Sequence, residues 1–375
     1  MKLIEKNTYG FEDVSLEPHP FSEVYSRKDV STSFELNNGL ILDTPIIASP
    51  MADVCDDSVA YAIDRAGGIG CIHRFQSIEE EVNMVHQVVQ AHANCFAAVG
   101  TTEDFIERAS ACIEAGAIGI IIDVAFLNAR TLQVCTAVRK KFPDTYLISG
   151  NVATGAGFRM GVDVGLDAIR VGIGNGQACR TSRVTGVGVG LVTSLMECYE
   201  EAVHYQGTRG RVAVICDGGI DVGGSLSKAY AAGAHMAIMG RAFAATHEGP
   251  GKGYLDEKGH KQWISEDDVE PHLLTGHPTK PLYKEYRGSA SMEAQMVYKK
   301  RGEIITSEGV RSLVKVYGSV GDVLGRFNGA LRSSMSYLGA KTLADFRSNA
   351  IFRLVANGVF NQQKARSLQT CEVTV

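Results

Sequence analysis

One cysteine of this chain lies in a sequence context that suits covalent chemistry. Cys179 is part of GIGNGQACRTS (172–182), where three glycines alternate ahead of it and Thr181 follows two residues later. Such glycines let the backbone turn tightly and point its amides at a ligand, and a thiolate there can attack an electrophilic carbon. The alternative is a packed, inert thiol, which is our interpretation of the cysteines inside apolar runs, Cys71, Cys95 and Cys216.

An Asp-Gly-Gly motif offers a second set of chemical groups. Asp217 can accept hydrogen bonds from two ribose hydroxyls, and Gly218 and Gly219 leave room for a phosphate against backbone amides. Gly240, which follows the next apolar run, completes the phosphate site that is usual in closed α/β barrels. Taken alone, DGG is also a common turn, so this interpretation depends on the fold.

The elements that must position these residues are predicted by short apolar runs. Eight such runs alternate with stretches whose apolar residues recur every three or four positions. The runs are 44–50, 68–74, 94–100, 118–124, 146–152, 167–174, 212–219 and 235–240. Eight strand–helix units in series predict a (β/α)8 TIM barrel, an α/β fold whose active site lies at the C-terminal ends of the strands. An open doubly wound sheet is the alternative.

Two segments lie outside this series. Residues 1–43 are expected to form an N-terminal arm or cap, and 44–375 a single barrel domain. After the eighth strand, residues 245–312 form a long polar insertion that we interpret as a flap over the site, with a surface excursion as the alternative. Helical patterning is predicted to resume at 320–332 and at 341–355.

Composition and charge exclude several classes of function. The net charge is −5 and there is no basic block, so we expect neither a nucleic-acid partner nor a membrane partner. No apolar run approaches the roughly 18 residues of a membrane span, and the charged N-terminus does not resemble a signal peptide. Nine cysteines without a CxxC pair argue against a disulfide framework or structural zinc. We therefore expect a cytoplasmic protein.

Several blocks of the chain carry a resemblance to a known family. GIGNGQACRTSRVTGVG (172–188) resembles the catalytic loop of the IMP dehydrogenase and GMP reductase family. Further blocks match in the same order: GNVATG (150–155), CDGGI (216–220), EYRGSAS (285–291) and NGALRSSMSYLGAKTL (328–343). The resemblance extends from near residue 9 to near residue 360 and implies the same barrel fold.

The resemblance implies a purine-nucleotide substrate and a set of residues that bind and convert it. Cys179 is implied to attack C2 of the purine, while Thr181 and Glu308 move protons to and from ammonia or water. The implied nucleotide-binding residues are Ser49, Met51, Gly176, Asp217, Gly218, Gly219, Gly240, Arg241, Tyr286, Gly288 and Ser289.

The family also implies a cofactor, a cation and an assembly. Asp123 and Asn151 are implied to lie near a nicotinamide cofactor, NADPH or alternatively NAD. The carbonyls of Gly174, Gly176 and Cys179 are implied to hold a monovalent cation such as K+. The implied assembly is a homotetramer.

The family contains two reactions that the sequence must separate. GMP reductase expels ammonia from GMP and takes a hydride from NADPH to give IMP, whereas IMP dehydrogenase oxidises IMP with NAD and hydrolyses the intermediate to XMP. A short flap without an Arg-Tyr pair between Ser291 and Glu308, His247 in AATHEG, and the lack of a paired regulatory module favour the reductase. GGIGCIHR (67–74) and FRLVANGVF (352–360) favour the dehydrogenase. We therefore predict GMP reductase, with IMP dehydrogenase as the alternative.

Some residues depart from the pattern of both branches. Gln177 and Arg241 stand where small residues are usual, Arg180 stands where a threonine is usual, and Ala52 replaces an aspartate. Arg180 or Arg241 could bind a phosphate through a bidentate guanidinium. A modified or unusual purine nucleotide is therefore a third hypothesis, and a non-catalytic nucleotide-binding relative a fourth.

Overall fold

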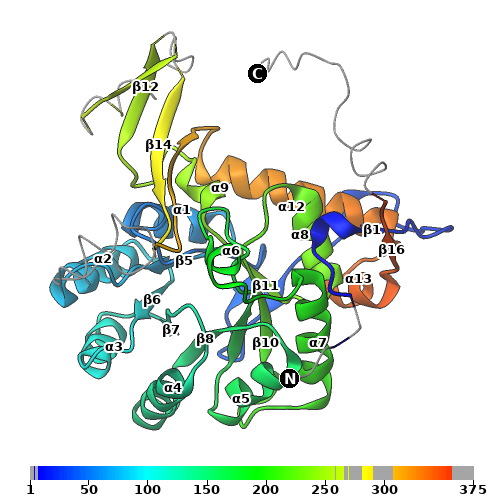
Figure 1. Ribbon diagram of the computed structural model, residues 1–375, viewed down its shortest axis with the longest axis horizontal. Helices are drawn as coiled ribbons and strands as arrows, with labels where there is room; N and C mark the ends of the chain where they lie inside the picture. Colours follow the sequence, from blue (N-terminus) through cyan, green and yellow to red (C-terminus); the bar gives the residue numbers. More distant parts are fainter. Residues whose placement is uncertain are drawn as a thin grey trace.

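Eight parallel strands close into a barrel in the computed structural model, which describes residue 4 and residues 7–257, 259–265, 269, 281–289 and 307–356. Their order around the barrel is β10-β11-β4-β5-β6-β7-β8-β9 (Figure 1). The strands are β4 (Ile46–Ala48), β5 (Ile69–Ile72), β6 (Cys95–Val99), β7 (Gly119–Ile122), β8 (Tyr146–Val152), β9 (Ala168–Val171), β10 (Ala213–Asp217) and β11 (Met236–Met239). Each lies within one predicted run, so the predicted TIM barrel is confirmed.

Helices surround the barrel as an outer layer (Figure 1). They are α1 (Asp57–Arg65), α2 (Ile78–Gln90), α3 (Phe105–Glu114), α4 (Ala129–Lys141), α5 (Gly155–Asp163), α7 (Leu191–His204), α8 (Gly223–Ala231) and α12 (Val320–Tyr337). Local sequence sets their ends: Ser77 and Glu80 form a reciprocal capping box at the start of α2, and Ser319 and Asp322 do the same for α12. Helix α12, predicted over 320–332, packs on α8 and α1.

Side chains alternate between the inside of the barrel and its helical layer, as the period of two along a strand requires. Ile121 of β7, Ala168 of β9 and Ile215 of β10 belong to the inner cluster, which Leu36 and Leu42 of the N-terminal segment also join. The side chains between them pack against the helices. The next inward positions along β7, β9 and β10 therefore lie at the C-terminal end of the barrel, and they are occupied by charged residues.

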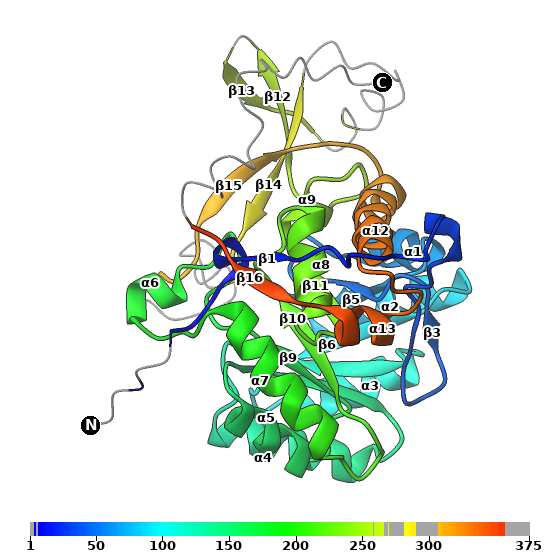
Figure 2. The same ribbon diagram turned by 90° about the vertical axis from the view of Figure 1, so that its right-hand side faces the viewer.

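A four-stranded antiparallel sheet projects from the barrel (Figures 1 and 2). Its order is β13-β12-β14-β15, with β12 (Gly253–Glu257), β13 (His260–Trp263), β14 (Leu282–Arg287) and β15 (Arg311–Lys315). It lies in the predicted flap insertion and extends three residues past it, to Lys315. Two short helices mark the same end of the barrel, α6 (Thr181–Thr185) and α9 (Arg241–Ala244).

The prediction of a helix over 341–355 is wrong in its last part. Helix α13 (Leu343–Asn349) ends early, and Phe352–Leu354 form strand β16, which pairs antiparallel with β1 (Val14–Leu16) (Figure 2). A partner strand more than 300 residues away in the sequence overrides the local helical pattern. Two shorter strands, β2 (Phe34–Glu35) and β3 (Ile41–Leu42), form a separate hairpin. Among the described helices, none is long and apolar enough to cross a membrane.

Candidate active site

Cys179 lies at the C-terminal end of the barrel, in the loop between β9 and α6. Its amide donates to the carbonyl of Gly176 at 2.9 Å, which closes a turn. Of the cysteines that the structure describes, Cys179 alone is not buried, whereas Cys71, Cys95 and Cys216 are fully buried as their apolar runs predict. Its half-exposed thiol is therefore accessible to a ligand at this rim.

A hydrogen-bond chain connects the thiol to a carboxylate. The Cys179 Sγ–H donates to Thr181 Oγ1 at 3.2 Å, and the Thr181 hydroxyl donates to Glu308 Oε2 at 2.7 Å. These contacts join the nucleophile, a hydroxyl and a base in the order that proton transfer requires. The three residues predicted as catalytic are thus brought together, although Glu308 is 127 residues from Thr181 in the sequence.

The flap is held against the cysteine loop by backbone contacts. Arg180 N donates to Glu308 O at 2.6 Å, and Val310 N donates to Ala178 O at 3.0 Å. A Cβ added to Gly288 would lie 2.7 Å from the Ala178 carbonyl oxygen, so the predicted site residue Gly288 is required for this close approach. Glu308 therefore owes its position to main-chain pairing between the flap and the loop.

A buried arginine links two of the predicted site carboxylates. Arg170 donates from Nη1 to Asp123 Oδ1 at 2.8 Å, and from Nε and Nη2 to Asp217 Oδ2 at 2.9 and 2.8 Å. Burial by itself lowers the pKa of the Arg170 guanidinium, but the charges of Asp217 and Asp123 outweigh burial and raise that pKa above its usual value. The guanidinium is therefore a permanent cation beneath the site.

The amide of Asn151 completes this network. Asn151 Nδ2 donates to Asp217 Oδ2 and to the Gly172 carbonyl, both at 2.7 Å. Every side-chain contact that the described residues make with the Asp217 carboxylate reaches Oδ2, so Oδ1 is left to accept from a ligand such as ribose. Sequence reasoning missed Arg170; the signal was a single arginine inside an otherwise apolar strand.

Backbone glycines and Tyr286 converge beside this network. A Cβ on Gly218 would lie 2.8 Å from Gly176 N, and one on Gly240 would lie 2.9 Å from Tyr286 Oη and 3.5 Å from Met51 Sδ. These five residues, all predicted to bind the nucleotide, thus border one region, which we term the glycine cradle. Burial raises the pKa of Tyr286, so its phenol is a neutral hydrogen-bond donor.

The structure also places four further predicted nucleotide-binding residues, Ser49, Gly219, Arg241 and Ser289. Ser49 is buried at the end of β4, where its amide donates to Met239 O. Gly219 has a φ of +72° and lies against Leu191. Arg241, the first residue of α9, and Ser289, just after β14, are exposed.

Two parts of the predicted site remain predictions. Asp123 accepts from Arg170 at 2.8 Å and pairs with Arg74 at 3.6 Å, and its contact with a cofactor stays a prediction. The Gly176 carbonyl proposed for a cation accepts from Cys179 N, and among the described residues no cluster of His, Cys, Asp or Glu could hold a metal. The part of the predicted flap over 290–306 lies outside the described residues.

Comparison with known proteins finds similarity over most of the chain. The family model described as IMP dehydrogenase / GMP reductase domain matches residues 8–265 and 275–364. An inosine-5'-monophosphate dehydrogenase of Borreliella burgdorferi is 28% identical over 401 residues, covering 93% of this chain and 94% of the relative. Those of Streptococcus pyogenes and Aquifex aeolicus are each 32% identical over 77% and 73% of this chain, which spans only 56% and 52% of their lengths.

Proposed function

The chain belongs to the IMP dehydrogenase / GMP reductase family, and from that premise we propose that it is a purine-nucleotide oxidoreductase whose Cys179 bonds covalently to C2 of the purine. We propose the oxidation of IMP with NAD as its reaction, because the relatives described above are named inosine-5'-monophosphate dehydrogenases. The observation that carries the proposal is the hydrogen-bond chain from Cys179 through Thr181 to Glu308.

This proposal reverses the order of the two sequence-based predictions. The Borreliella dehydrogenase is covered to 94% by this chain, so the lack of an inserted regulatory module does not distinguish a reductase. GMP reduction with NADPH is the second candidate, because no Arg-Tyr pair lies between Ser291 and Glu308 to serve as the base for hydrolysis. Under the leading proposal, Thr181 and Glu308 must activate water themselves.

The proposed reaction has two steps that use the same proton relay. The Cys179 thiol loses its proton through Thr181 to Glu308, which is half-buried and can exchange it with solvent. The thiolate adds to C2, the C2–H bond breaks with loss of a hydride, and a covalent thioimidate remains. Water then attacks C2 while Thr181 takes its proton and passes its own to Glu308; the C–S bond breaks and XMP leaves. In the reductase direction, the relay instead protonates the departing ammonia.

The residues around Asp217 fit a nicotinamide cofactor and a ribose. Asn151 is 8% exposed, and its Oδ1 has no hydrogen-bond partner among the described residues. A buried acceptor of this kind suits the N–H of a carboxamide or a sugar hydroxyl. When bound, the cofactor would accept the hydride; this chain contributes the acceptor and the carboxylate that orient the ligands.

Two incubations test the reaction. IMP with NAD, and separately GMP with NADPH, are followed by the absorbance of the reduced cofactor. An increase in this absorbance with IMP and NAD supports the leading proposal. A decrease with GMP and NADPH supports the second candidate. No change in either would refute both. Cys179→Ala should abolish turnover while nucleotide binding by calorimetry persists; unchanged turnover would remove Cys179 from the mechanism.

Three further proposals concern the surroundings of the enzyme. We propose a homotetramer, a cytoplasmic location and a monovalent cation on the cysteine loop, as the family resemblance implies. Sedimentation velocity tests the assembly, because a monomer would contradict it. Turnover in K+ compared with a bulky organic cation tests the cation.

A further inference from the structure

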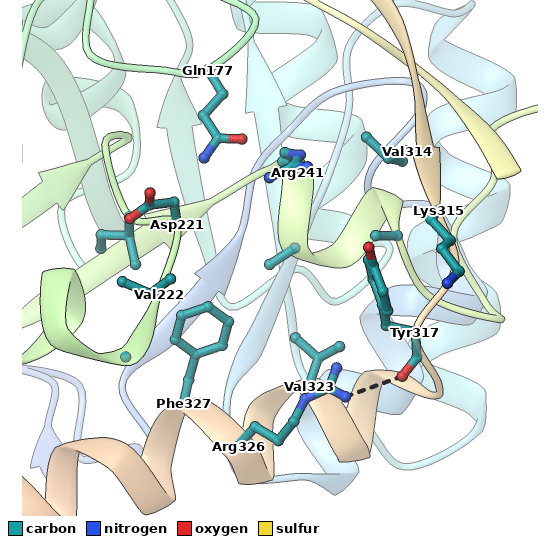
Figure 3. A pocket seen from close by; sticks show the side chains of 14 residues that line it. Gln177, Asp221, Val222, Arg241, Val314, Lys315, Tyr317, Val323, Arg326 and Phe327 are labelled. Carbon is teal, nitrogen blue, oxygen red and sulfur yellow. Dashed lines mark hydrogen bonds between the residues drawn. The ribbon is translucent and has the colours of Figure 1, made fainter. Parts of the chain in front are cut away.

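A pocket of about 370 Å³ opens beside the glycine cradle (Figure 3). Its walls come from the loop between β10 and α8, from α9, from the end of β15 and from α12. This volume lies within the range of about 300–1,000 Å³ that is usual for small-molecule sites. None of the catalytic residues lines the pocket, so it needs an explanation of its own.

The pocket begins where the proposed phosphate site ends. Gln177 and Arg241 line it, and each directly follows a glycine of the cradle, Gly176 and Gly240. A group attached to a phosphate in the cradle would therefore enter the pocket between these two side chains.

Positive charge predominates along the pocket. Arg241, Lys315 and Arg326 line it, against the single carboxylate of Asp221. Among the described residues, the Arg241 side chain has no hydrogen-bond or ion-pair partner, and Arg326 donates one hydrogen bond from Nη1 to the Tyr317 carbonyl at 3.1 Å. Asp221 Oδ1 accepts from Ser225 Oγ at 2.6 Å. Guanidinium groups with free N–H donors favour a phosphate here.

The remaining wall is apolar. Val222, Val323 and the ring of Phe327 face the same space as Arg241 and Gln177 (Figure 3). A pocket that combines cations with aliphatic and aromatic groups suits a phosphate that carries an organic group more than a solvated inorganic ion.

We propose that this pocket binds a second phosphate joined to the first, so that a purine nucleoside 5′-diphosphate or its ester binds more tightly than the monophosphate of the proposed reaction. This inference rests on the proposed function, because it places the first phosphate in the glycine cradle. The second phosphate binds Arg241 and Arg326, and the apolar wall has room for a group esterified to it.

Calorimetry on the Cys179→Ala protein tests the proposal without turnover. IDP should bind at least about tenfold more tightly than IMP, since a hydrogen bond to a charged group contributes about that factor. Arg326→Gln in the same background should remove most of this preference, and Arg326→Lys only part of it. The matched control Lys140→Gln removes one exposed charge from α4 and should leave the IDP-to-IMP ratio unchanged. Thermal unfolding checks that each variant is folded.

Three results would overturn the inference or its premise, and they are distinguishable. If IMP binds and IDP binds equally or less tightly, the pocket does not take a second phosphate. If pyrophosphate binds to protein already saturated with IMP, the pocket is an independent anion site and the inference is wrong. If neither nucleotide binds, the proposed function itself fails.

Discussion

Arg170→Met removes the guanidinium that lies between Asp123 and Asp217 while keeping a long, unbranched side chain. The Arg170 side chain is 8% exposed and those of Asp123 and Asp217 are 13% and 14% exposed, so the variant leaves two largely buried carboxylates without their cation. We expect a lower free energy of unfolding and weaker nucleotide binding, because Asp217 loses the contacts that orient it.

The structure sets the size of the effect. Removing one partner of a buried ion pair costs about 3–5 kcal/mol. Two carboxylates lose their shared cation here. Asp217 still accepts the hydrogen bond from Asn151 at 2.7 Å, and Asp123 still forms an ion pair with Arg74 at 3.6 Å. We therefore expect about 4 kcal/mol rather than twice the single-pair value. Nucleotide affinity should fall about tenfold, the equivalent of one misdirected hydrogen bond.

Urea unfolding at neutral pH, followed by circular dichroism, measures the change in the free energy of unfolding. Arg170→Lys keeps the charge but not the planar set of N–H donors. Its free energy of unfolding should therefore lie between those of the wild type and Arg170→Met. Adding Asp123→Asn to Arg170→Met should restore part of the lost free energy of unfolding, because it removes one buried carboxylate charge that no longer has Arg170 as its partner. A loss below about 1 kcal/mol for Arg170→Met, or no recovery in the double variant, would refute the reasoning.

Three other outcomes follow from the structure. Glu308→Gln keeps an acceptor for Thr181 but not a base, so kcat should fall about 10²–10⁴-fold with KM little changed; an unaltered kcat would exclude the relay. Gly288→Ala places a Cβ 2.7 Å from Ala178 O and should cut activity about tenfold or more. Gly321→Ala, whose Cβ would lie 3.7 Å from Ser319 Oγ, should be neutral in the same assay. Burial lowers the pKa of His73 to about 4 from its usual value of 6.5. The unfolded chain therefore binds the extra proton between these pH values, and stability should fall by about 3 kcal/mol as pH drops through this window. His73→Asn should flatten that part of the stability profile, and an equally steep profile would contradict the assignment.

The sequence predicted the barrel because its strands are encoded locally. Each of the eight apolar runs buries both faces, one inside the barrel and one under the helices, and this produces a signal that needs no knowledge of distant residues. The late turn from helix to strand at Phe352–Leu354 was not predictable in this way, because its cause is pairing with Val14–Leu16.

The candidate site was predicted as a set of residues, but not as an arrangement. Residue type and spacing predicted the glycine loop, Cys179 and Asp217 as site residues. They did not single out Arg170, which lies inside a predicted strand. Its importance comes from the alternation that points it inward beside Asp123 and Asp217, at the mouth of a closed barrel.

The sequence by itself determined the number and order of the strands, the reactive cysteine and the kinship with a nucleotide-converting family. Only the tertiary structure decided that Glu308 contacts Thr181, that Arg170 joins two carboxylates, and that Arg241, Lys315 and Arg326 line one pocket. The physical reason is that hydrophobic periodicity acts over a few residues, whereas barrel closure and flap docking depend on contacts between segments that are far apart in the chain.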